Sequence, residues 1–145
     1  MKPMQKIKQY TLASVLAVLS ITGAQAETLN ANTVELENFV GRVQIVTSNR
    51  ANIQLDMDAG TGIRDLPQVR VEDGVARIFY DKRVKVRECN ESGRATDTGK
   101  WLKRVSIKLK GGAKRKLSAY PSLRIEVPAG TGLITNGGVI FGTAE

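Results

Sequence analysis

The sequence predicts an all-β protein, and three observations lead to that prediction. Apolar residues alternate with polar residues over short runs, which is the period of a half-buried strand. Glycine, asparagine, aspartate and proline interrupt these runs at short and fairly even intervals. After residue 26, no window of 11 or more residues keeps a helical period. Many short strands with regular turns are typical of a β-sandwich, a β-barrel or a stacked β-solenoid.

The first 26 residues are of a different kind and predict a cleavable signal helix. Lys2, Lys6 and Lys8 form a positive start, Thr11–Ile21 is apolar, and Ala24-Gln25-Ala26 is a small-x-small cleavage site at Ala24 and Ala26. The apolar run is too short for a stable membrane span. We therefore expect a signal peptide at 1–26, a single β domain at 27–145, and export to the periplasm or cell surface of a bacterium.

The strands follow in order along the remaining chain. Their alternating residues are centred on Val34–Val40, Val43–Ile45, Ile53–Met57, Val69–Val71, Val75–Tyr80, Val84–Val86, Val105–Leu109 and Leu123–Val127. Asp73-Gly74 predicts a tight hairpin turn, because both residue types tolerate positive φ. Pro128 ends the last of these strands. Residues 90–100 are polar and predict a loop.

Composition favours a β-solenoid over the alternative, a β-sandwich. Aromatic residues are few, and the late segments are rich in Val, Ile, Leu, Gly, Thr and Asn, which suits stacked rungs with Gly and Asn corners. The apolar run Val139-Ile140-Phe141 would then lie on a rung with an open edge. We expect either further rungs, so that 27–145 is the N-terminal part of a longer solenoid, or a partner that covers this edge, including self-association through it.

Two blocks of sequence also resemble a known family. The stretch 33–45 (TVELENFVGRVQI) is similar to the opening of exported bacterial proteins of the head-GIN domain, auto-transporter adhesin family. The stretches 123–133 (LRIEVPAGTGL) and 136–142 (NGGVIFG) resemble a strand-Pro-Gly rung of that family and the Gly-rich corner after it. The resemblance implies a right-handed β-helix or related β-solenoid in the cell envelope, with no established catalytic site.

Composition also excludes several kinds of chemistry. The chain has no histidine, which removes the commonest general base and metal ligand, so zinc sites and Ser-His-Asp or Cys-His catalysis are excluded for the chain alone. Cys89 is the single cysteine and cannot close an internal disulfide. We expect it to be a half-buried thiol, and the alternative is a disulfide between two chains. We predict no catalytic residue, no metal and no cofactor. The enzyme alternative is a carbohydrate-active β-helix using Asp56 and Asp58, which share a strand face; the competing interpretation is a polar outward face.

The densest charge feature is the segment 82–116, which holds thirteen basic and three acidic residues. Removal of 1–26 lowers the net charge from +8 to +5, so the rest of the domain is acidic. Lys108 and Lys110 are predicted to share one strand face. The candidate polyanion-binding residues are Lys100, Lys103, Arg104, Lys108, Lys110, Lys114, Arg115 and Lys116. The competing interpretation is a solvated face that limits strand aggregation.

Together these observations predict an exported, non-enzymatic envelope protein that acts as a structural or interaction module. Its partner would be an envelope polysaccharide or protein, with no specific nucleic acid and no membrane span after cleavage. The alternative function is binding of an anionic envelope polymer through the basic segment 82–116.

Overall fold

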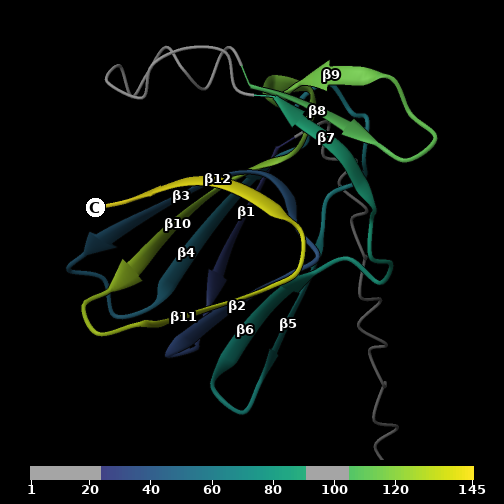
Figure 1. Cartoon of the computed structure of the whole chain (residues 1–145). Coiled ribbons are helices and arrows are strands. Elements are labelled where there is room, and N and C mark those ends of the chain that lie inside the picture. Colours follow the sequence, from purple (N-terminus) through teal and green to yellow (C-terminus); the bar gives the residue numbers. More distant parts are fainter. Residues whose placement is uncertain (1–23, 91–104) are drawn as a thin grey trace, which may run out of the picture.

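The computed structural model describes residues 24–90 and 105–145 (Figure 1). Within these residues the chain forms twelve strands, one short 3-10 helix and no α-helix. The strands make three open sheets with mixed parallel and antiparallel pairing, and no sheet closes into a barrel. The prediction of an all-β fold is confirmed, and the arrangement of the two larger sheets is compatible with a β-sandwich.

Sheet A has five strands and sheet B has four. The order in sheet A is β1 (Ala24–Leu29), β4 (Ile53–Asp58), β10 (Ser122–Pro128), β3 (Val40–Ser48) and β12 (Val139–Ala144). The order in sheet B is β11 (Gly132–Asn136), β2 (Thr33–Glu37), β6 (Val75–Phe79) and β5 (Gln68–Glu72). Strand β3 has a parallel partner on each side, as does β2, whereas β1, β4 and β5 pair antiparallel with their neighbours.

The main hydrophobic core lies between sheets A and B. The period-2 pattern places alternate residues of each strand on the buried side, as the sequence predicts. These include Ile53, Leu55 and Met57 of β4, Leu123, Ile125 and Val127 of β10, Val34 and Leu36 of β2, and Ala76 and Ile78 of β6. Each fully buried Val, Leu, Ile or Met side chain of this set contributes about 1.5–3 kcal/mol relative to exposure. Packing of two apolar sheet faces therefore holds the two layers together.

Sheet C is smaller and has its own core. It consists of β7 (Val86–Asn90), β8 (Ser106–Leu109) and β9 (Lys114–Lys116), and it is followed by the 3-10 helix η2 (Leu117–Ala119). Ile107 and Tyr120 pack with Val40 of sheet A in a second buried cluster. The Tyr120 hydroxyl donates to the Ile107 carbonyl at 3.1 Å. Figure 1 shows sheet C at one end of the two larger sheets, where this cluster attaches it.

Two segments each pass from sheet B to sheet A, and they pair with each other in parallel at a constant offset in residue number. Residues 33–37 pair in parallel with 132–136, and residues 40–45 pair in parallel with 139–144, with the same offset on both sides of the corner. Asn38, Gly137 and Gly138 have positive φ at the corners. The Asn38 N–H donates to the Asn136 carbonyl at 2.9 Å, and the Val139 N–H donates to the Phe39 carbonyl at 2.8 Å. The two bent segments are therefore hydrogen-bonded through the corner itself (Figure 1).

The local predictions agree with the structure at several points. Asp73 and Gly74 have φ values of 50° and 77° in the β5–β6 hairpin, as the Asp-Gly pair predicts. The strands β1, β9 and β11 were not among the predicted ones. The expected signal helix falls on residues 1–23, outside the described residues. Ala24 to Ala26, its expected cleavage site, lie in β1 rather than in a helix, because their backbone pairs with β4.

Candidate functional site

Four basic residues line one groove where sheet C meets the start of β12. We call this the basic groove; it has a volume of about 570 Å³ and is lined by Arg83, Val84, Lys85, Val86, Arg87, Lys110, Gly138 and Val139. The four basic side chains belong to exposed residues, whereas Val84, Val86 and Val139 are half-buried. The groove thus combines a partly apolar lining with charged groups that reach solvent.

The surrounding backbone explains how these residues come together. Arg83, Lys85 and Arg87 are exposed and alternate with the half-buried Val84 and Val86. Strand β7 begins only at Val86, and its pairing with β8 is irregular between Val86 and Glu88. The Lys110 N–H donates to the Lys85 carbonyl at 2.8 Å, which places the turn after β8 beside this segment. The turn continues through Gly111, whose φ of 80° favours glycine. The opposite wall is the β11–β12 corner.

The electrostatic setting of the basic groove distinguishes it from the other arginine-containing surfaces. Among residues 24–90 and 105–145, no acidic residue lines the groove, and none of its four basic side chains forms an ion pair with another residue of this set. By contrast, Arg77 contacts Glu35 at 3.2 Å, and Arg124 contacts Asp56 at 4.0 Å. Four like charges that share one groove without counter-charges create a positive potential, which attracts anions.

The predicted basic residues are divided among several places. Lys110 lies in the basic groove, beyond the end of β8, so the prediction that it shares a strand face with Lys108 is wrong. Cross-strand pairing puts Lys108 opposite Lys114 and Ser106 opposite Lys116, so these three lysines share one face of sheet C. Arg115 pairs with Ile107, so it lies on the opposite face of sheet C from these lysines. Lys100, Lys103 and Arg104 lie outside the described residues.

Three groove residues were not among the candidate residues predicted from sequence. Arg83, Lys85 and Arg87 belong to the basic segment, but the prediction favoured its second half. Their alternation with Val84 and Val86 is the signal that could have found them, because it predicts a strand with one basic and one apolar side.

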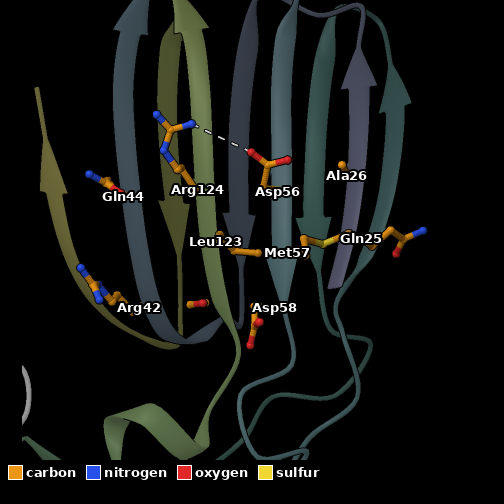
Figure 2. Close-up of a pocket in the computed structure, with 10 residues that line it drawn as sticks. Gln25, Ala26, Arg42, Gln44, Asp56, Met57, Asp58, Leu123 and Arg124 are labelled. Atoms are coloured by element: carbon orange, nitrogen blue, oxygen red, sulfur yellow. Dashed lines mark ion pairs between the residues drawn. The ribbon is translucent and has the colours of Figure 1, made fainter. Parts of the chain in front are cut away.

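A second, polar depression lies on the outward face of sheet A. Figure 2 shows Arg42, Gln44, Arg124, Asp56 and Asp58 around this depression. Its volume is about 400 Å³. Because two arginines and two aspartates line it, its formal charges balance. This depression therefore lacks the excess of positive charge that distinguishes the basic groove.

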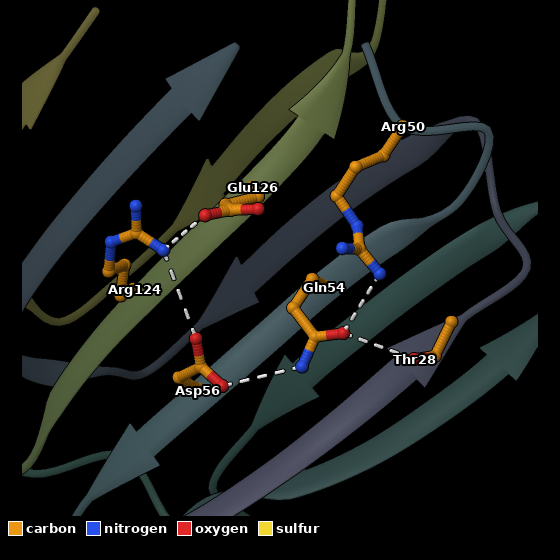
Figure 3. A network of polar contacts seen from close by, with 6 residues as sticks. All are labelled: Thr28, Arg50, Gln54, Asp56, Arg124 and Glu126. Carbon is orange, nitrogen blue, oxygen red and sulfur yellow. Dashed lines mark hydrogen bonds and ion pairs between the residues drawn. The ribbon is translucent and has the colours of Figure 1, made fainter. Parts of the chain in front are cut away.

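A hydrogen-bonded network crosses this polar face from β10 to β1 (Figure 3). Arg124 forms ion pairs with Glu126 and Asp56, and the Gln54 amide donates to Asp56 at 3.3 Å. Arg50 and Thr28 donate to the Gln54 side-chain oxygen at 3.2 Å and 3.1 Å. These contacts tie neighbouring strands together, and each exposed ion pair of this kind contributes about 0–1 kcal/mol.

The two aspartates of the enzyme alternative both have local partners in this arrangement. Asp56 is held by Arg124 and Gln54, and Asp58 accepts a hydrogen bond from the Gly60 N–H at 2.6 Å in the turn after β4. Among residues 24–90 and 105–145 no group of three or more Cys, Asp or Glu residues is placed to hold a metal ion. The interpretation of a polar outward face opposite the buried residues of β4 is confirmed.

Cys89 lies on β7 and is exposed, with no disulfide. The expectation of a half-buried cysteine is therefore wrong. Its cross-strand partner is Ile107, yet β7 lies at the edge of sheet C, where solvent reaches its side chains.

The chain matches no protein-family model, no curated protein and no solved structure. The head-GIN resemblance thus stays a prediction. In the part of the chain that the structure describes, no helix has the length and apolar character needed to cross a membrane. The functional argument therefore depends on the geometry and charge of the surfaces described above.

Proposed function

We propose that this chain is an exported, non-enzymatic module of the bacterial cell envelope that binds an anionic polymer through the basic groove. The observation that supports this function best is the grouping of Arg83, Lys85, Arg87 and Lys110 in one groove, which no acidic residue lines in the part of the chain that the structure describes. The first three are exposed at every second position of the chain, which suits a ligand with repeated negative groups, such as a phosphorylated or carboxylated polysaccharide.

Binding would follow from charge and from hydrogen-bond geometry. Arg83 and Arg87 offer planar guanidinium groups that can donate two parallel hydrogen bonds to one phosphate or carboxylate. Lys85 and Lys110 act as point charges between them. The lysines on the outer face of sheet C (Lys108, Lys114 and Lys116) would extend the contact along a longer polymer. Such attraction weakens as salt rises, because ions screen exposed charges.

The finer architecture that we propose is a β-helix or related β-solenoid, in agreement with the head-GIN resemblance. The parallel, constant register between 33–45 and 132–144 supports it, because successive rungs of a solenoid stack in this way. The mixed pairing at β1, β4 and β5 is the feature that favours a sandwich instead. In either architecture the basic groove lies at the end of the body that carries sheet C.

Retention of the full chain on immobilised heparin, followed with rising salt, tests the proposed function. The double variant Arg83→Gln/Arg87→Gln should elute at clearly lower salt than the wild type. Loss of two contacts should also reduce the slope of log Kd against log salt by about one unit or more, by analogy with single-stranded nucleic acids.

The matched control is Arg42→Gln/Arg70→Gln, which removes the same charge from exposed positions outside the basic groove. We expect it to elute close to the wild type. Equal shifts for both double variants would mean that net charge alone causes retention, and a wild type that is not retained at low salt would contradict polyanion binding.

A further inference from the structure

Two neighbouring rows on the outward face of sheet A carry both an aspartate and an arginine, but only one row is closed by an ion pair. A row here means the residues that pair directly across adjacent strands. In the first row, Asp56 of β4 pairs with Arg124 of β10, and their side chains form an ion pair at 4.0 Å. In the second row, Asp58 of β4 pairs with Ser122 of β10, which pairs with Arg42 of β3. The two opposite charges of the second row therefore stand on either side of a small residue.

The charges of the second row have no ionic partner in the part of the chain that the structure describes. Neither Asp58 nor Arg42 forms an ion pair with another residue of that part, and both are exposed. Both line the polar depression of about 400 Å³, together with Ser122. Figure 2 shows Arg42 and Asp58 on either side of the lower part of the view. The second row is thus accessible to a ligand, whereas the ion pair of the first row ties two strands together.

The three residues of the second row offer complementary hydrogen-bonding groups. The Asp58 carboxylate is held by the Gly60 N–H, which donates to it at 2.6 Å, and a carboxylate has capacity to accept further hydrogen bonds. The Arg42 guanidinium can donate two parallel hydrogen bonds to one carboxylate. Between them, the Ser122 hydroxyl can both donate and accept. A ligand that matches this row carries a cationic donor at one end and an anionic acceptor at the other.

We propose that the depression binds a small zwitterion with the dimensions of a dipeptide, with its ammonium group at Asp58 and its carboxylate at Arg42. The Cα atoms of these residues are two strand spacings apart, about 10 Å. Side chains of strands stand roughly perpendicular to the sheet, so the two charged groups stay separated. An extended dipeptide is about 7 Å long, which lets its ends approach both groups. The site needs no residue of the basic groove, so it stands or fails independently of polymer binding.

Titration of the full chain with dialanine, followed by two-dimensional nuclear magnetic resonance, tests this site. We expect dialanine to bind and to shift the backbone amide signals of Arg42, Ser122 and Asp58. N-acetyl-dialanine and dialanine amide each lack one charged end and should bind at least tenfold more weakly. Alanine carries both charges on one carbon and should also bind at least tenfold more weakly. Binding of N-acetyl-dialanine as tightly as dialanine would mean that the carboxylate alone is recognised, and it would overturn the proposal.

Single variants test the two ends of the site separately. Asp58→Asn and Arg42→Gln each remove one charge and should each raise the Kd for dialanine at least tenfold. Asparagine keeps an oxygen that can accept the Gly60 hydrogen bond, so Asp58→Asn changes mainly the charge. The matched controls are Asp73→Asn and Arg70→Gln, at exposed positions of sheet B outside the depression, and they should leave the Kd unchanged. Circular dichroism should show that all four variants are folded. A wild type that does not bind dialanine, or a Kd that Asp58→Asn and Arg42→Gln leave unchanged, would overturn the proposal.

Discussion

Replacement of Gly138 by alanine should destabilise the protein strongly, because this glycine allows the two bent segments to meet at their corner. Its φ is 82°, and a Cβ atom there would lie 2.0 Å from the Phe39 carbonyl oxygen and 2.7 Å from the Phe39 nitrogen. The Phe39 backbone cannot move aside easily, because the Phe39 side chain is fully buried in the main core. The same carbonyl accepts the Val139 hydrogen bond.

The size of the effect follows from two contributions. Alanine in the left-handed region costs about 1 kcal/mol relative to glycine. The backbone overlap adds the loss of the Val139 hydrogen bond, about 1 kcal/mol, and displacement of β12 from β3. We therefore expect Gly138→Ala to lower the free energy of unfolding by about 3–4 kcal/mol, which lies in the range of strain and overpacking variants.

Gly130→Ala is the control, because Gly130 has the same φ of 82° but no atom within 4 Å of the added Cβ. It should lose only the backbone contribution, about 1 kcal/mol. Urea unfolding followed by far-ultraviolet circular dichroism measures both variants. If both variants lose the same free energy of unfolding, backbone conformation alone accounts for the need for glycine at 138. The close approach of Phe39 would then not be the reason.

Two further predictions concern pH and processing. Burial raises the pKa of Tyr80 to about 12. The charge of Arg64 opposes this rise, and the charge of Asp65 adds a smaller contribution to it. The unfolded chain loses this proton near pH 10, so the contribution of Tyr80 to the free energy of unfolding should be complete below pH 10 and fall between pH 10 and 12. The fall should be less than about 2.7 kcal/mol, because water reaches the half-buried ring. Urea unfolding of Tyr80→Phe over that range should show a smaller fall than the wild type, and parallel curves would exclude Tyr80 as the cause. N-terminal sequencing of the exported protein should begin at Glu27, which would leave Glu27–Leu29 of β1 paired with Ile53–Leu55; an intact Met1 would contradict the predicted cleavage.

The basic groove shows where reasoning from sequence reaches its limit. The charge density of segment 82–116 is plain in the sequence and favours its second half, yet among the predicted residues that the structure describes only Lys110 lies in the groove. The hydrogen bond between Lys110 and Lys85 joins two segments that are 25 residues apart. Because such pairing depends on contacts far along the chain, charge counts alone could not show which basic residues meet.

The all-β class, the buried side of most strands and the Asp73-Gly74 turn can be predicted from the amino-acid sequence alone. Each depends on local properties: side-chain alternation, breaker residues and tolerance of positive φ. The neighbours of each strand emerge only in the folded protein, including the parallel partners on both sides of β3 and the register between 33–45 and 132–144. The physical reason is that alternation specifies which side of a strand is buried, whereas backbone hydrogen-bonding groups are alike in every strand. The choice among partners is therefore made by packing across the whole core.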